Sequence, residues 1–296
     1  MANRIQDTAG DRMFYRVNAI LLMLLTLSVL YPIIYVLANS FSSPAAVSSG
    51  KVYLWPLDSS VEGYRRVLEN PNILSGFLNS VFYTVVGTAI NLAMTMIAAY
   101  PMARKDLPLR SFFSVLFAFT MLFGGGMIPN YILIMKLGML NTRWALLLPG
   151  ALSVYNMIIA RTAMQSLPDE LLEAAYIDGC SDARYFVRIV LPLSGATIAV
   201  LALYYAVGHW NSYFSAFMYL SDRSKYPLQI VLREILIMGQ IAESDITDLD
   251  SAERIQGLSQ LLKYALIVIS SAPMMLIYPF VQKYFVKGVM IGSLKG

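Results

Sequence analysis

The stretch that decides the fold is NPNILSGFLNSVFYTVVGTAINLAMTMIAAYPMA, residues 70–103, which contains no Asp, Glu, Lys or Arg. A helix needs about 20 mostly apolar residues to cross the hydrocarbon core of a bilayer. This run exceeds that length and carries no charge that would oppose insertion. It therefore predicts a membrane-spanning helix.

Five further charge-free runs are long enough, or nearly so, to extend the same argument along the chain. They cover residues 17–50, 111–135, 144–160, 189–221 and 264–282. The six runs predict an all-α membrane protein with six transmembrane helices. We expect these helices near 17–38, 77–102, 111–134, 143–162, 195–219 and 262–283.

The composition agrees with a membrane protein. Hydrophobic residues make up 57% and charged residues 14% of the chain, against about 45–50% and about 25% in soluble proteins. The net charge of +4 is mild and requires no nucleic-acid partner, since basic residues beside a bilayer give the same value. A single cysteine, Cys180, excludes an internal disulfide framework, and a single histidine, His209, excludes a histidine-rich metal site.

Six spans place both termini on one side, and the basic residues indicate the cytoplasm. The short loop 104–110 is rich in Arg and Lys, and the chain after residue 263 contains lysines but no acid. We expect a cytoplasmic N-terminal segment over 1–16, a transmembrane domain over 17–296 and a cytoplasmic tail over 284–296. The first apolar run is too long for a secretion signal, so we expect it to be retained.

One charged stretch, LLEAAYIDGCSDARYFVRIVLP (residues 171–192), lies between the apolar runs. Seven charged residues fall between Asp169 and Arg188. Each costs roughly 2.5–3.5 kcal/mol at the centre of a membrane helix, so together they exclude a position in lipid. The predicted orientation places the stretch in the cytoplasm.

The same stretch, taken from residue 166 to 192, carries the signals of two helices joined by a turn. Ser166 is a plausible N-cap for the first helix. Gly179 suits the C′ position with positive φ, and Ser181 can cap the second helix. Small residues around the turn would let another chain approach closely. From these residues alone, the segment is equally a simple link between two spans or a docking element.

Three short motifs add a resemblance: Glu173-Ala174-Ala175, Asp178-Gly179-Cys180 and Ile189-Val190-Leu191-Pro192. Together they resemble the EAA loop of ABC importer permeases, with Cys180 in place of the usual alanine. The whole chain resembles sugar-importer permeases of the MalG kind. It is most similar to the LplC/YtcP group in FTMLFGGGMIPNYIL, GHWNSYFSAFMYL and KYFVKGVMIGSLKG.

The resemblance implies a type I ABC importer permease fold in a bacterial plasma membrane. It implies a second, different permease subunit, two ATPase subunits and an extracytoplasmic solute-binding protein as partners. The EAA loop would be the coupling helix that docks on an ATPase, and the tail Lys287 to Gly296 would reach the ATPase dimer. The residues expected to couple are Glu173, Ala174, Ala175, Asp178, Gly179 and Cys180.

Chemistry within the chain itself is not expected. The sequence has no G-x-x-x-x-G-K-[ST] loop to hold phosphates. We therefore predict no catalytic residue, metal or cofactor here, with ATP and Mg²⁺ bound by partner subunits.

Four polar residues within or beside the predicted spans are candidates for the substrate path: His209, Asn211, Asn79 and Asn130. Ionisable residues inside membranes are functional candidates by default, but each of the four could instead pair with a neighbouring helix. The predicted function is a permease subunit that imports an oligosaccharide or related sugar. The alternatives are a permease for peptides or another solute, and a membrane protein that does not transport.

Overall fold

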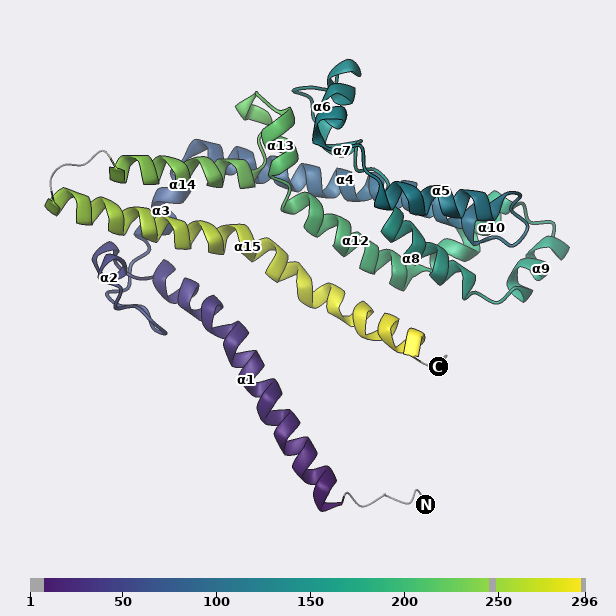
Figure 1. The fold of residues 1–296 in the computed structure, drawn as a ribbon, viewed down its shortest axis with the longest axis horizontal. Coiled ribbons are helices and arrows are strands. Elements are labelled where there is room, and N and C mark those ends of the chain that lie inside the picture. Colours follow the sequence, from purple (N-terminus) through teal and green to yellow (C-terminus); the bar gives the residue numbers. More distant parts are fainter. Residues whose placement is uncertain (1–7, 245–248, 294–296) are drawn as a thin grey trace. The chain divides into compact units, whose positions relative to one another are not determined.

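The computed structural model describes residues 8–244 and 249–293, in which all regular structure is helical (Figure 1). The elements are α1 (Ala9–Ser40), α2 (Pro44–Ser48), α3 (Glu62–Leu68), α4 (Pro71–Ala103), α5 (Arg110–Leu122), α6 (Met127–Lys136), α7 (Trp144–Leu147), α8 (Val154–Gln165), α9 (Glu170–Ile177), α10 (Asp182–Tyr185), a π-helix (Phe186–Val190), α11 (Leu191–Leu193), α12 (Gly195–Trp210), α13 (Phe214–Tyr219), a 3₁₀-helix (Arg223–Lys225), α14 (Leu228–Ser244) and α15 (Leu249–Ser293).

The chain divides into two compact units, each built from two separate stretches. One unit comprises Met1–Asn70 and Glu234–Ser271, and the other comprises Pro71–Arg233 and Ala272–Gly296. The first contains α1, which begins at a capping box between Thr8 and Asp11. The apolar side chains of α1 are exposed over most of its length, as expected of a helix that faces lipid or another subunit.

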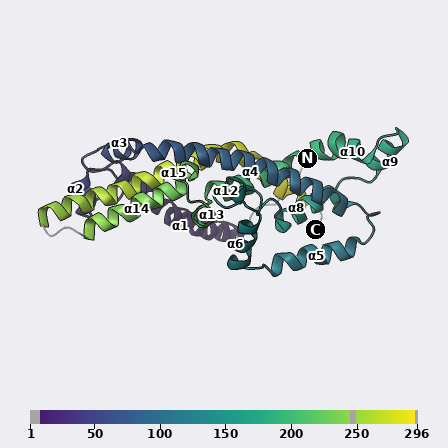
Figure 2. The same cartoon turned by 90° about the horizontal axis from the view of Figure 1, so that it is seen from above.

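The second unit is organised around α4, the helix predicted from the opening stretch. Its buried residues recur every three or four positions, which places them on one face of the helix. They are Ile73, Gly76, Asn79, Ser80, Tyr83, Gly87, Asn91, Thr95, Met96, Ala99 and Met102. Helices α12 and α8 pack against α4 (Figure 1 and Figure 2). This face therefore forms the centre of the unit.

Within residues 8–244 and 249–293, three helices are long and apolar enough to cross a membrane: Gly10–Ser40, Pro71–Ala103 and Gly257–Pro279. Two bent pairs bring the number to five if each pair is one span. The predicted helix 111–134 is one of these pairs, because α5 ends at Leu122 and α6 continues at an angle of 108°. The glycines at 124–126 explain the break, since Gly126 has φ of 80°.

Two other predicted helices are also interrupted. The helix expected over 143–162 consists of α7 and α8, with a non-helical segment at 148–153 that includes Pro149 and Gly150. The helix expected over 195–219 stops at Trp210 and resumes as α13. The last predicted helix, 262–283, lies inside the 45-residue α15, which is about 68 Å long at ~1.5 Å per residue.

The predicted N-terminal segment and tail lie partly outside the described residues. Helix α1 begins at Ala9 rather than near 17, and residues 1–7 are not described. Residues 284–293 of the predicted tail form the end of α15, and 294–296 are outside the described part.

Candidate coupling site and buried polar core

The charged stretch forms a helix, a tight turn and a second helix, as the sequence predicts. Helix α9 ends at Ile177, and Gly179 follows in the left-handed region with φ of 71°. The N–H of Gly179 donates to the carbonyl of Tyr176 at 3.0 Å, and the N–H of Cys180 donates to that of Ala175 at 2.8 Å. This pair of bonds is a Schellman motif, which fixes the direction in which the chain leaves the helix.

The start of α9 differs from the prediction. Ser166 is not its N-cap, because α8 continues to Gln165 and Ser166 caps the C-terminus of α8. The Ser166 hydroxyl donates to the carbonyl of Ala163 at 2.7 Å. Asp169 takes the N-cap position of α9 instead, without a side-chain capping bond. Ser181 does stand at the N-cap of α10, also without such a bond.

The residues expected to couple are divided between an outer and an inner face of the turn. Glu173, Ala174, Asp178 and Gly179 are exposed, Cys180 is partly buried, and Ala175 is buried. The side chain of Ile177 is 87% exposed at the end of α9. Ile177 is thus available for contact with another protein.

The inner face of the turn is held by Arg104, which follows the C-terminus of α4. Its guanidinium contacts both Asp106 oxygens at 2.8 and 2.6 Å, Asp182 at 3.2 Å and the Tyr176 hydroxyl at 2.7 Å. The Tyr176 hydroxyl in turn donates to Asp182 at 2.8 Å. The hydrogen bonds from Arg104 lower the pKa of Asp106 to about 2, and they raise the pKa of Arg104 itself. Arg104 and Asp106 therefore both stay charged throughout the physiological pH range.

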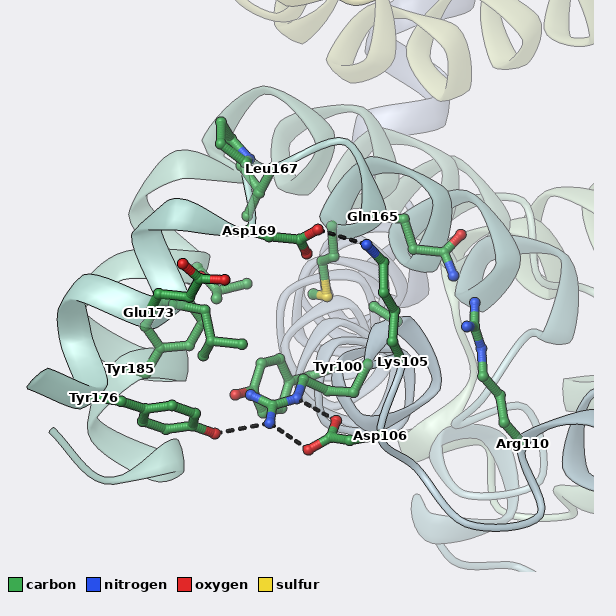
Figure 3. A pocket seen from close by; sticks show the side chains of 16 residues that line it. Tyr100, Lys105, Asp106, Arg110, Gln165, Leu167, Asp169, Glu173, Tyr176 and Tyr185 are labelled. Carbon is green, nitrogen blue, oxygen red and sulfur yellow. Dashed lines mark hydrogen bonds and ion pairs between the residues drawn. The ribbon is translucent and has the colours of Figure 1, made fainter.

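A second bond ties the same loop to α9, where Lys105 Nζ lies 2.5 Å from Asp169. Between this loop, the end of α8 and α9 lies a pocket of about 530 Å³ (Figure 3). Glu173 lines this pocket.

Arg104 and Lys105 were not expected in this site from the sequence alone. As part of the basic loop 104–110, both predict only the orientation of the chain. One signal for the contact between the loop and the two short helices is charge complementarity. The loop is basic, and Asp169 and Asp182 stand at the starts of α9 and α10. Both segments were predicted on the same side of the membrane.

A buried polar cluster occupies the centre of the second unit. The side chain of Asn91 in α4 is 1% exposed and donates from Nδ2 to the carbonyl of Gly150 at 2.5 Å. Its Oδ1 lies 2.6 Å from His209 Nε2 in α12. An amide oxygen only accepts, so Nε2 carries the proton of the imidazole. One turn along α4, Thr95 bonds to the Tyr205 hydroxyl at 2.6 Å.

The path candidates occupy different places in the second unit. Asn79 is buried and donates to the carbonyls of Ser224 and Tyr226 at 2.8 and 3.1 Å. Asn211 is exposed, and its side chain donates to the carbonyl of Val207 at 3.0 Å. Asn130 is exposed on α6. His209 and Asn79 thus have protein partners, and a role of the four in transport stays a prediction.

A second pocket, of about 640 Å³, lies between α8, α12 and the part of α15 that belongs to the same unit. Its polar and aromatic lining comes from Tyr155, Asn156, Tyr204 and Tyr278. Aromatic rings with a polar group suit sugars, whose faces are apolar and whose edges carry hydroxyls. The sequence alone does not group these residues, because they come from three helices far apart in the chain.

The sequence matches, over residues 1–291, the family described as the inner membrane component of binding-protein-dependent transport systems. The chain belongs to this family, and it is the membrane-embedded permease component of an ABC importer. Its match covers nearly the entire chain.

Two relatives come from Bacillus subtilis (strain 168). The chain is 40% identical to Protein LplC over 99% of this chain and 98% of the relative. It is 41% identical to the polygalacturonan/rhamnogalacturonan transport system permease protein YtcP, over 93% and 96%. A solved bacterial ABC transporter that imports the acidic polysaccharide alginate contains a chain with 34% identity and a TM-score of 0.84, covering 95% of this chain and 99% of that one.

Proposed function

We propose that this permease forms the translocation path for an oligosaccharide derived from an acidic polysaccharide. It pairs with a second, different permease subunit in a bacterial plasma membrane. Two ATPase subunits bind ATP and Mg²⁺ on the cytoplasmic side, and a solute-binding protein delivers the cargo from the other side. The chain contributes six spans, with both termini in the cytoplasm.

The six spans correspond to α1, α4, the α5–α6 pair, α7–α8, α12–α13 and α15. Breaks within spans are compatible with a bilayer where neighbouring helices satisfy the freed backbone groups. Asn91 does so at Gly150, in the break between α7 and α8. The basic loop at Arg104 and Lys105 supports a cytoplasmic position for the α9–α10 turn.

The observation that carries the coupling role is the two-sided construction of α9. Its inner face is tied to the end of α4 through Arg104 and Lys105, while Ile177 stands open to solvent. A partner that moves the open face therefore moves a segment bonded to the central helix. In this proposal, ATP binding closes the ATPase pair, α9 follows, and the permease pair changes from inward-facing to outward-facing.

The cargo class is supported by the relatives and by the second pocket. Two of the similar proteins named above handle polygalacturonan/rhamnogalacturonan and alginate. The tyrosines of the pocket offer the flat apolar surfaces on which sugar rings bind. A peptide permease is the alternative that the cargo experiment must exclude.

Coupling is tested at Gly179, where a side chain would meet no atom within 4 Å but would be strained by the positive φ. Left-handed backbone costs roughly 1–2 kcal/mol for an ordinary residue, which corresponds to about a tenfold change in an equilibrium. In the complete importer in proteoliposomes, we expect Gly179→Val to lower binding-protein-stimulated ATP hydrolysis and uptake about tenfold. Gly179→Asn is the matched control, because Asn tolerates this conformation, and it should retain most activity.

Equal activity of the Val and Asn variants would show that the geometry of this turn does not matter for coupling. Assembly is checked separately by copurification of all subunits. The cargo is tested with the same proteoliposomes and the cognate binding protein. We expect uptake of galacturonate or alginate oligosaccharides and none of oligopeptides of similar length, and the reverse preference would replace the sugar assignment by the peptide one.

A further inference from the structure

Two arginines on neighbouring helices meet at the edge of the pocket beside α9. Arg110 is the first residue of α5, and Arg161 lies in α8, which packs against α5. With the amide of Gln165 turned so that its oxygen faces the two guanidinium groups, that oxygen accepts from Arg110 Nη2 and, at 3.3 Å, from Arg161 Nε. Two positive charges thus share one neutral acceptor.

No carboxylate neutralises this pair among the residues that the structure describes. The nearby acids Asp106 and Asp169 are bonded to Arg104 and Lys105. Glu173 also lines the pocket, but Figure 3 places it on the opposite side from Arg110, with Lys105 between them. Adjacent guanidinium groups without a counter-ion repel each other, and an anion between them removes that repulsion.

The donors of the pair are only partly used. The Nε of Arg110 is buried and has no acceptor. Arg161 donates from Nη1 to the Ser114 hydroxyl at 3.2 Å, and that hydroxyl donates to the carbonyl of Arg110 at 2.8 Å. The free N–H groups of Arg110 and Arg161 match the oxygens of a phosphate, which arginine binds through several parallel hydrogen bonds. The N-terminus of α5 adds its partial positive charge at the same place.

The surface next to this pair is apolar. None of the residues of α5 is buried, and Phe112, Val115, Phe119 and Leu122 are each more than half exposed. An ion pair of guanidinium and phosphate at one end of an exposed apolar helix matches the two parts of a phospholipid. The acyl chains would lie along α5 and the headgroup against the arginines.

We propose that Arg110 and Arg161, with Ser114 and Gln165, bind the phosphate of an anionic phospholipid in the cytoplasmic leaflet. The leaflet rests on the orientation given under Proposed function, whereas the phosphate chemistry rests on the two arginines alone. A bound lipid would link helix α5 to helix α8, close to the start of α9. Lipid composition would then influence how firmly the base of the coupling helix is held.

The test uses the purified importer complex and native mass spectrometry with phosphatidylglycerol and phosphatidylcholine as separate probes. We expect tighter binding of phosphatidylglycerol, and a loss of at least tenfold in its affinity when Arg110→Gln and Arg161→Gln are combined. The matched control is Arg65→Gln with Arg66→Gln, which removes the same charge from exposed positions on α3 and should change nothing. Arg110→Lys with Arg161→Lys keeps the charge and should retain most of the preference.

Equal binding of the two lipids by the unmodified complex would overturn the proposal without any variant. Unchanged phosphatidylglycerol affinity in the assembled double Gln variant would do the same. A third arm adds inorganic phosphate at millimolar concentration. Inorganic phosphate that binds as tightly as phosphatidylglycerol would overturn the lipid as the source and leave a site for free phosphate. Because the readout is lipid binding, its failure is separate from a failure of ATPase coupling.

Discussion

Helices α1 and α4 are nearly equal in length, with 32 and 33 residues, and both are long and apolar enough to cross a membrane. They are used in opposite ways. None of the most apolar 18 residues of α1 is buried within this chain, whereas 33% of those of α4 are. The buried residues of α4 include polar and small ones along its whole length, among them Asn79, Gly87 and Asn91.

The difference teaches that hydrophobicity predicts a span but not its position in the bundle. Lipid tails are as apolar as leucine, so apolar side chains gain little by leaving lipid for another helix. Close packing and hydrogen bonds determine which faces meet. In α4 these are supplied in the middle of the helix by Gly87 and Asn91. In α1, Thr26 bonds only within its own helix, and the bond to another helix comes at the C-terminal end, where the Ser40 hydroxyl lies 2.7 Å from that of Tyr64 in α3.

The largest expected effect comes from Asn91→Leu. The substitution removes the acceptor of His209 and the donor to Gly150, and each buried group without a partner costs about 1–3 kcal/mol. We expect the free energy of unfolding to fall by roughly 2–4 kcal/mol in SDS titration of the purified protein. Thr26→Leu in α1 is the control and should change it by less than about 0.5 kcal/mol. Equal effects of Asn91→Leu and Thr26→Leu would show that buried side-chain hydrogen bonds do not distinguish α4 from α1.

Gly87→Ala should have the next largest effect. A Cβ at this position would collide with the imidazole of His209, so the ring must move away from Asn91. Overpacking of this kind costs roughly 1–3 kcal/mol. In α1, Gly10→Ala adds a Cβ whose nearest atom is Thr8 Oγ1 at 3.7 Å, and it should leave stability unchanged or raise it by up to about 1 kcal/mol. Thermal unfolding of both variants measures this difference. A Gly87→Ala variant as stable as the unmodified protein would contradict the close contact between Gly87 and His209.

The smallest expected effect is that of Tyr83→Phe. The Tyr83 hydroxyl donates to the carbonyl of Lys225 at 2.8 Å, and the ring itself is kept by the substitution. Loss of this bond should lower the free energy of unfolding by about 1 kcal/mol. Tyr31→Phe in α1, where the hydroxyl belongs to an exposed ring, should have no measurable effect. Identical results for the two tyrosines would show that side-chain hydrogen bonds stabilise α4 only in the middle of the helix, around Asn91.

Much of the fold follows from the charge-free runs, and α4 in particular is close to its prediction. The breaks at 123–126 and 148–153 were not predicted, because glycine and proline also occur inside continuous membrane helices. Whether a helix breaks there depends on partners from elsewhere in the chain. At Gly150 the partner is Asn91, 59 residues away.

The same distinction holds for the coupling site. The turn at Gly179 was predictable, since the glycine and the helix formers before it are local signals. The bond from Arg104 to Asp182 joins residues 78 positions apart, and no local pattern specifies it. Ser166 shows the opposite case. It is a capping residue, as the sequence predicts, but it caps the C-terminus of α8 and not the N-terminus of α9, because α8 continues to Gln165.

The bond between Asn91 and Gly150 also bears on the order in which the chain is made. The ribosome delivers α4 before residues 148–153, so the amide that satisfies the broken segment is already present when that segment emerges. His209, the other partner of Asn91, is synthesised last. A chain that is permuted so that α4 follows α8 would expose the carbonyl of Gly150 without its partner during insertion, and we expect such a chain to be degraded more often before assembly.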